Sequence, residues 1–440
     1  MELVPLAPIV VIGGSLAGMA AAARLAKAFG SSSRRAASAV VLLESTDRLG
    51  GRYAGYRYPD ASEALVDDLP GMINFPAPWR DLFRKSGRVF ETELARSGLA
   101  LVPAPAAVHR FADGTELTLG SDRGAQLAQL TSACGRPAAE RWRDLLDHLD
   151  DVWQALRPLG SEYELTSADQ IAASGLHRLV KPGRTIEQLA RDIDHPQLAE
   201  IIRTVAWRAG SDPRRTPAWC AAQLSVERTF GRWMISHDGH PTRTGTLVDA
   251  LATRLATRDV DVRTTTTATS VRPNRHTAWS VETTGGRIEA AAVIAAVNPW
   301  TYAELTGDRA GLRRLTPALA PQISHTVSEQ PTDEPTETIA HTRTGPVISW
   351  TRPLPGQRTL TSTHDWTRAM PDRGAGIGWR GDKTWLRMPP VRTGRPRLYR
   401  AGPHNRGGPA LWSVILTGAL ASYACHDDLF APAGERSVPG

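Results

Sequence analysis

A glycine-rich segment between two short apolar runs constrains the fold of this chain more than any other feature. Residues 9–12 (IVVI) form a β-branched run that leads directly into residues 13–18 (GGSLAG). An alanine-rich helical pattern follows over residues 19–29, and a buried-strand pattern over residues 39–43 ends at Glu44. This order of strand, glycine turn, helix, strand and acid is the order of a parallel βαβ unit that binds a dinucleotide.

The residue types of the glycine segment suit contact with phosphates. Gly13 allows a tight turn, and Gly18 lets the helix pack closely on the strand. The N-terminus of the helix then offers unpaired N–H groups to a pyrophosphate. Glu44 stands where a carboxylate accepts hydrogen bonds from an adenosine ribose and repels a 2′-phosphate. Ser15 replaces the middle glycine of the usual fingerprint, and we expect its hydroxyl to donate to the phosphate. The loop alone predicts a dinucleotide and leaves open which one.

The residues after Glu44 make the prediction specific. Residues 44–52 (ESTDRLGGR) resemble the acid-then-Arg-x-Gly-Gly-Arg segment of the flavin amine oxidase and phytoene desaturase superfamily. In that superfamily the segment lies over the FAD pyrophosphate, so the resemblance implies FAD as the cofactor. It also implies that Arg52 lies near the phosphates.

The resemblance is collinear over nearly the whole chain and favours the phytoene desaturase branch. The matching segments are residues 66–73, 110–117, 244–251, 292–299 and 398–418. Three positions depart from the family pattern: Leu69 replaces a glycine, Thr242-Arg243 replaces a Gly-Gly, and Pro403 stands where amine oxidases usually carry an acid.

The glycine segment and the resemblance together predict the site residues. The expected FAD-binding residues are Gly13, Ser15, Leu16, Ala17, Gly18, Glu44, Arg48, Gly50, Gly51, Arg52, Pro70, Gly71, Ala268, Gly402, Gly408 and Gly418. His404 and Trp412, which we expect to flank the flavin edge, are the candidate catalytic residues. The helix that begins near Gly408 is expected to point its positive end at the flavin. No metal site is predicted, because no His/Cys cluster has a ligand spacing.

These motifs predict an α/β fold: a Rossmann-like FAD-binding domain with a βαβ unit of the glutathione-reductase type, and a discontinuous α+β substrate domain. The predicted FAD-binding domain comprises residues 1–75, 235–310 and 395–430; the predicted substrate domain comprises 76–234 and 311–394; residues 431–440 form a frayed tail. We further expect one amphipathic helix over residues 138–156 and helix over residues 185–208. Residues 311–390, rich in Pro, Thr, Arg and Gly, are expected to form short strands and loops.

The amino-acid composition limits the classes of binding partner that we expect. The formal charge of +7 comes almost entirely from arginines spread along the chain, which is typical of a solvated surface rather than a nucleic-acid site. No apolar run approaches the ~20 residues of a membrane-spanning helix, and no secretory signal is expected. The three separated cysteines fit a reduced cytoplasmic protein, although contact with a membrane surface stays open. The thirteen tryptophans could line an apolar substrate cavity.

The leading functional hypothesis is an FAD-dependent oxidoreductase. The resemblance implies that a hydride passes from a C–H bond of a mostly hydrophobic small molecule, such as a terpenoid or another secondary metabolite, to the flavin. The lysine that holds a water at the flavin of amine oxidases has no collinear counterpart here.

Two alternatives remain. One is a redox-neutral flavoprotein, such as an isomerase. The other is a degenerate flavoprotein that serves as a binding or scaffold partner, because Ser15, Leu69 and Thr242-Arg243 all stand where the backbone should approach the cofactor. The sequence predicts neither the substrate, the electron acceptor nor the oligomeric state.

Overall fold

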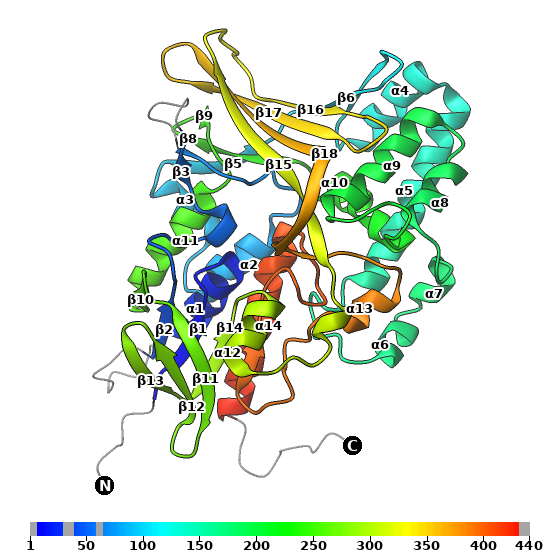
Figure 1. Ribbon diagram of the computed structural model, residues 1–440. Helices are drawn as coiled ribbons and strands as arrows, with labels where there is room; N and C mark the ends of the chain where they lie inside the picture. The colour runs from blue at the N-terminus through cyan, green and yellow to red at the C-terminus, as the bar shows by residue number, and fades with distance from the viewer. Residues whose placement is uncertain (1–6, 30–38, 59–64, 431–440) are drawn as a thin grey trace.

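A parallel five-stranded sheet lies at the base of the molecule in the computed structural model, which describes residues 7–29, 39–58 and 65–430 (Figure 1). Its strand order is β10-β2-β1-β14-β19. The strands are β1 (Ile9–Ile12), β2 (Val40–Leu43), β10 (Asp261–Arg263), β14 (Ala292–Ala295) and β19 (Leu398–Arg400). This arrangement confirms the predicted Rossmann-like α/β fold. The predicted frayed tail, residues 431–440, lies outside the described residues.

Both faces of this sheet are covered, because its three central strands, β2, β1 and β14, are apolar and buried at every position. In β1, Ile9 and Val11 contact one core while Val10 and Ile12 contact another, as the two-residue period of a strand requires. The first core includes the helices α1 (Leu16–Phe29), α2 (Ala77–Lys85), α3 (Phe90–Ala95), α11 (Thr246–Thr257) and α14 (Leu411–Phe430). The second core includes the antiparallel strands β11 (Ala268–Asn274), β12 (Ala278–Thr283) and β13 (Gly286–Ala290), and helix α12 (Pro299–Thr306).

A larger, six-stranded sheet lies at the opposite end of the molecule, in the order β15-β18-β17-β16-β6-β7 (Figure 1). Its strands are β6 (Ala107–Arg110), β7 (Glu116–Leu119), β15 (Pro317–Ser328), β16 (Thr336–Ala340), β17 (Val347–Leu354) and β18 (Arg358–Ile377). The expectation of short strands in residues 311–390 is wrong, since β18 alone has 20 residues. These strands are half-exposed and rich in threonine, a good strand former that resembles loop composition when its neighbours are proline and glycine.

Helices pack beside the large sheet, on the right in Figure 1. They are α4 (Arg123–Cys134), α5 (Arg136–Leu156), α6 (Ala168–Ala173), α7 (Leu176–Leu179), α8 (Ile186–Asp192), α9 (Pro196–Arg208) and α10 (Ala222–Phe230). Helix α5 has the predicted buried stripe. The helix expected over residues 185–208 is instead two helices. Pro196 begins α9 and the preceding His195 is extended, because a proline disfavours helical backbone in the residue before it.

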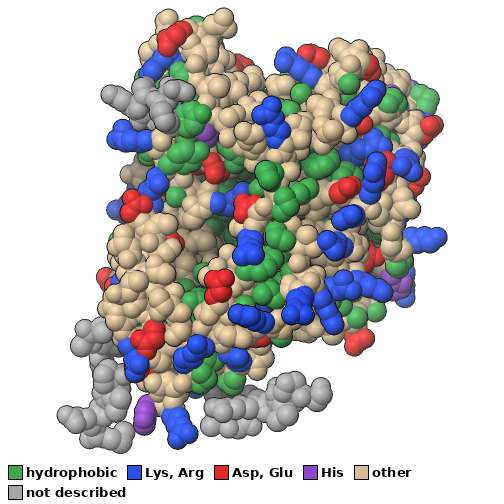
Figure 2. Space-filling model, in the orientation of Figure 1, with side chains coloured by type: hydrophobic (Ala, Val, Ile, Leu, Met, Phe, Trp, Pro, Cys, Tyr) green, Lys and Arg blue, Asp and Glu red, His purple; other side chains and the backbone are tan. Residues whose placement is uncertain are grey.

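Shorter elements connect these layers. They are β3 (Tyr56–Arg57), β4 (Leu65–Val66), β5 (Leu99–Pro103), β8 (Trp233–His237), β9 (His240–Pro241) and α13 (Lys383–Arg387). On the face shown in Figure 2, basic and acidic side chains are interspersed. The division of the chain into a cofactor domain and a substrate domain stays a prediction.

Helices α1 and α14 approach so closely that Gly418 tolerates no side chain. A Cβ on Gly418 would overlap the Ala17 carbonyl oxygen and lie 3.0 Å from the Ala20 Cβ. We predict that Gly418→Ala lowers the free energy of unfolding by about 1–3 kcal/mol, because overpacking forces the backbones apart. Urea denaturation followed by circular dichroism measures this change.

The matched control is Gly124→Ala in the exposed helix α4, where a Cβ would meet only the Asp122 carboxylate at 3.5 Å. This variant should be as stable as the unmodified protein or slightly more stable, because alanine favours helix. Equal stability of the two variants would contradict the proposed close packing.

Candidate functional site

The loop between β1 and α1 has the shape that a phosphate requires. Gly13 has a φ of 101°, and a Cβ there would lie 2.7 Å from the Ala296 carbonyl oxygen. A Cβ on Gly18 would overlap the Gly13 carbonyl. The backbone therefore runs closely under the N-terminus of α1, where Leu16 and Ala17 begin the helix with N–H groups that have no partner within it. This cradle fits a pyrophosphate.

Glu44 holds this loop in place. Its side chain is buried, and Oε2 accepts the backbone N–H of Gly14 at 2.8 Å. Oε1 accepts the N–H and the hydroxyl of Thr46 at 2.8 and 2.9 Å. Oε1 also accepts the Ser45 hydroxyl at 3.3 Å, whereas among the described residues Oε2 accepts only the Gly14 N–H, so acceptor capacity for the ribose contact predicted from the sequence remains on Oε2.

Ser15 and the Gly-Gly pair pack against each other. The Gly50 N–H donates to the Gly14 carbonyl at 2.7 Å, and a Cβ on Gly51 would lie 3.5 Å from the Ser15 Cα. The Ser15 hydroxyl donates to the Ala296 carbonyl at 3.1 Å. Its proton is therefore directed to the residue that follows β14, and contact of this hydroxyl with a phosphate stays a prediction.

The two arginines of this segment lie in different places. Arg48 is on the surface and donates to the Gly55 carbonyl at 2.8 Å. Arg52 lines a large cavity, and its guanidinium lies 5.9 Å from the centre of the Tyr53 ring. Within the described part of the chain, Arg52 has no carboxylate partner. It is the arginine of the pair that could meet a cofactor phosphate.

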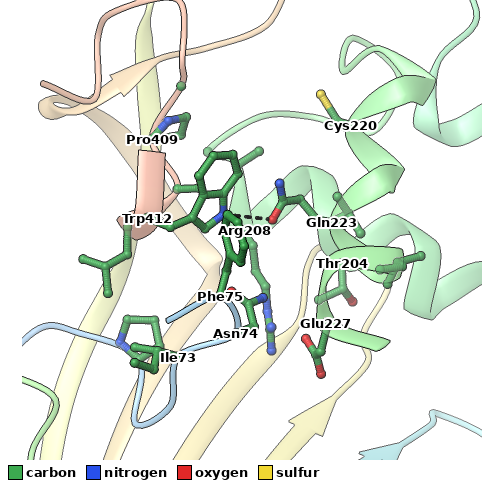
Figure 3. Close-up of a pocket in the computed structure, with 18 of the residues that line it drawn as sticks. Ile73, Asn74, Phe75, Thr204, Arg208, Cys220, Gln223, Glu227, Pro409 and Trp412 are labelled. Atoms are coloured by element: carbon green, nitrogen blue, oxygen red, sulfur yellow. Dashed lines mark hydrogen bonds between the residues drawn. The ribbon is translucent and has the colours of Figure 1, made fainter. Parts of the chain in front are cut away.

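This cavity, of about 390 Å³, lies between the six-stranded sheet, the helical layer and the segments that precede α2 and α14. One wall is a face of the six-stranded sheet, and a second consists of side chains from α5, α9 and α10. The third comprises residues 68–75 and the loop of residues 406–412 before α14, which Figure 3 shows converging on the helical wall. Nine of the thirteen tryptophans line it: Trp79, Trp142, Trp153, Trp219, Trp350, Trp366, Trp379, Trp385 and Trp412.

The predicted site residues form two groups around this cavity. Arg52, Pro70 and Gly408 line it, and a Cβ on Gly408 would meet no atom within 4 Å, so there is open space beside it. Gly71 packs against the Trp350 ring, with 2.7 Å between its added Cβ and the ring. The second group surrounds the α1 N-terminus and comprises Gly13, Ser15, Leu16, Ala17, Gly18, Glu44, Gly50 and Gly51.

Three predicted FAD contacts have structural roles here. The Gly402 N–H donates to the Thr417 hydroxyl at 3.0 Å, which joins β19 to α14. Gly418 allows α14 to contact α1. Ala268 begins β11 and packs against the second core. Direct contact of these residues with a cofactor stays a prediction.

The two candidate catalytic residues differ in position. Trp412 lines the cavity, contacts Phe75 and Trp153 edge to face, and donates its indole N–H to Gln223 at 3.4 Å (Figure 3). His404 is buried outside the cavity lining, and its Nε2 donates to the Arg373 carbonyl at 2.6 Å. This bond joins the loop after β19 to β18, and a catalytic role for His404 stays a prediction.

A buried charge network beside the cavity was missed from the sequence. Glu337 on β16 accepts hydrogen bonds from Arg208 at the end of α9, at 2.8 Å, and from Arg232, which also pairs with Glu227 of α10. Burial raises the pKa of Glu337, but the charges of Arg232 and Arg208 outweigh it and hold that pKa at about 2. No sequence signal could have revealed this network, because its members are distant along the chain.

Two departures from the family pattern leave the cavity open. Arg243 fills the space beside Gly55 and Gly245, pairs with Asp67 and Asp249, and lines a smaller, separate pocket. Leu69 lines the large cavity, and its N–H donates to Asp67 at 3.0 Å. These positions therefore keep room for a cofactor and a substrate.

A match to a known protein family shows which family this chain belongs to. The family model described as flavin containing amine oxidoreductase matches residues 16–348. The chain belongs to this family. Membership confirms FAD as the predicted cofactor and an FAD-dependent oxidoreductase as the predicted class of protein.

Two relatives of this flavoprotein are, by name, a desaturase and a dehydrogenase. Hydroxyneurosporene desaturase from Cereibacter sphaeroides is 26% identical over 239 residues, which are 53% of this chain and 45% of the relative. Phytoene dehydrogenase from Streptomyces griseus is 29% identical over 230 residues, 52% of this chain and 42% of the relative. The matches span less than half the length of these relatives. They support the phytoene desaturase-like branch.

The fold also matches a solved structure of the family. Cyclohexylamine oxidase from Brevibacterium oxydans IH-35A superposes with a TM-score of 0.64 at 12% identity, over 97% of this flavoprotein and all of the oxidase. This likeness shows the fold alone. Across the residues described above, no helix has the length and apolar character needed to span a bilayer.

The first prediction for the site concerns Glu44. Glu44→Ala should weaken FAD binding at least about tenfold, because the Gly14 N–H loses a charged acceptor and the phosphate loop loosens. The dissociation constant of FAD, titrated into apoprotein, measures the effect. Asp47→Ala is the control, since that side chain is 75% exposed in the same segment. Equal losses in both variants would contradict a loop-specific role.

The second prediction concerns His404 and pH. Burial lowers the pKa of His404 from 6.5 to about 4, so between these values the unfolded chain binds a proton that the folded chain does not. The free energy of unfolding should therefore fall as the pH drops from about 6.5 to 4. His404→Gln, which can still donate to the Arg373 carbonyl, should reduce this pH dependence. Urea denaturation at several pH values tests it, and an unchanged slope in the variant would exclude His404 as a cause.

Proposed function

We propose that this flavoprotein dehydrogenates a mostly hydrophobic small molecule by passing a hydride to FAD. The observation that carries the proposal is the tryptophan-lined cavity, which includes Pro70 and Gly408, the residues expected beside the flavin. Its volume of about 390 Å³ is in the range of small-molecule sites. A desaturase and a dehydrogenase among the relatives support oxidation of a C–H bond.

The chain positions the substrate and surrounds it with apolar side chains that keep water away. FAD, when bound, supplies the acceptor for the hydride. The edge-to-face cluster of Phe75, Trp153 and Trp412 forms a rigid apolar surface on which a hydrocarbon skeleton can rest. Helix α14 begins at Leu411, three residues after Gly408, and its dipole favours negative charge on a group placed at its N-terminus.

A flavin ring between Pro70 and Gly408 would occupy part of the cavity. The remaining volume suits a molecule of a few rings, held inside, better than a long chain held along its whole length. We therefore propose a compact terpenoid or aromatic secondary metabolite as the substrate class.

Anaerobic mixing of the holoenzyme with candidate terpenoid and aromatic metabolites tests the proposal. The expected result is bleaching of the flavin absorbance, together with a product that lacks two hydrogens by mass spectrometry. Trp412→Ala should lower kcat/KM at least about tenfold, because truncating a buried aromatic side chain removes apolar contact.

The outcomes separate the alternatives. A product of unchanged mass, formed without an electron acceptor, would instead establish a redox-neutral isomerase. Purified protein that neither retains nor rebinds FAD would overturn the proposal and favour a binding or scaffold role.

A further inference from the structure

The sheet wall of the cavity carries buried polar nitrogens without partners. Within the described part of the chain, Trp350 Nε1, Trp366 Nε1 and His364 Nε2 make no hydrogen bond. Each of these residues lines the cavity, and each is only 7% exposed. We call this group the donor cluster.

The three side chains lie on neighbouring positions of one sheet face. His364 and Trp366 are two residues apart on β18, so they point to the same side. Trp350 lies on the adjacent strand β17, and its ring meets that of His364 edge to face with 4.8 Å between centres. The Trp350 side chain also packs on Gly71, in the segment expected beside the flavin. The donor cluster is therefore close to the proposed reaction site.

Three other tryptophans of the same cavity are paired. Trp142 donates to Gln126 at 3.2 Å, Trp385 to the Arg406 carbonyl at 2.6 Å, and Trp412 to Gln223 at 3.4 Å. Trp153, on the helical wall, is the third cavity tryptophan whose buried N–H has no partner among the described residues. Buried donors are rarely left unpaired, because such a donor loses its hydrogen bonds to water without forming new ones in the protein. The concentration of unpaired nitrogens on one wall indicates a partner that enters the cavity.

The charges around the cavity also favour a ligand that accepts hydrogen bonds. Its lining contains five arginines and two acids: Arg52, Arg208, Arg228, Arg232, Arg406, Asp68 and Glu227. Both acids already accept hydrogen bonds from the protein, Glu227 from Arg232 and Asp68 from the Tyr56 hydroxyl at 2.9 Å. Each acid is thus partly occupied and arginines outnumber acids in the lining, so the cavity favours a ligand oxygen over an ammonium group.

We propose that the substrate carries a carbonyl or carboxylate oxygen that accepts hydrogen bonds from Trp350, His364 and Trp366, while its hydrocarbon part lies among the other tryptophans. This inference deepens the proposed function, since it assumes that the cavity is the substrate site. It predicts an oxygenated substrate rather than a pure hydrocarbon or an amine.

Binding of matched naphthalenes to the holoenzyme tests the donor cluster. The probes are 2-acetylnaphthalene, 2-naphthoate, 2-ethylnaphthalene and 2-naphthylmethylamine, and calorimetry measures each affinity. We expect the acetyl or the carboxylate probe to bind about tenfold more tightly than the ethyl probe, the difference that one hydrogen bond of ordinary strength makes. The acetyl and carboxylate probes distinguish a neutral from an anionic oxygen. The amine should bind most weakly.

Variants that keep an aromatic ring but remove the indole N–H show whether these N–H groups cause the preference for oxygenated probes. Trp350→Phe combined with Trp366→Phe should bring the affinities of the oxygenated and ethyl probes to within about twofold of each other. Trp142→Phe is the matched control, because its N–H is already paired with Gln126, and it should keep the wild-type ratio.

The results divide cleanly. Equal affinities for the oxygenated and ethyl probes in the wild type, tightest binding of the amine, or a ratio that survives in the double variant would overturn the inference. The flavin content and melting temperature of each sample are measured alongside. Loss of FAD from the wild type would count against the proposed function, whereas a flavin-loaded protein without an oxygen preference counts against this inference alone. A double variant that fails to fold is replaced by the single variants, each expected to reduce the ratio.

Discussion

Close backbone contact at three glycines is the constraint on which the rest of the structure depends. Gly13 turns the chain beneath the α1 N-terminus, Gly18 brings α1 against that turn, and Gly418 brings α14 against α1. Because α14 begins where the cavity loop ends, its position also decides where Gly408 and Trp412 lie. A side chain at Gly18 or Gly418 would separate layers whose contact shapes both the phosphate cradle and one cavity wall.

The other two cavity walls are held together by charge. Glu337 on the large sheet joins Arg208 at the end of α9 to Arg232 beside β8, and Arg232 also holds Glu227 of α10. A buried ion network of this kind adds little net stability, but it allows few arrangements of the elements that carry it. It keeps the helical wall at a set distance from the sheet wall, and the cavity lies between them.

Local patterns predicted the cofactor half of the protein well. The glycine loop, its helix, the second strand and Glu44 are continuous in sequence, so their geometry follows from short-range sterics. Predictions from local patterns failed where contacts with distant parts of the chain determine the structure. Residues 185–208 were predicted as one helix, but the helix is interrupted before Pro196. Strand β18 was predicted as short strands and loops, because one side of its sheet is exposed and its sequence is therefore not apolar throughout. The bond from the Ser15 hydroxyl to the Ala296 carbonyl, 281 residues away, was likewise not predictable from a local pattern.

The sequence by itself determined the family and the βαβ unit with its glycine loop and Glu44, since these depend on motifs of residues close together in the chain. Only the tertiary structure decided that nine tryptophans from distant segments line one cavity. It also decided which of their N–H groups find a partner and which, as in Trp350 and Trp366, do not. The physical reason is that pairing and burial depend on long-range packing, and no local pattern records which side chains meet across a cavity.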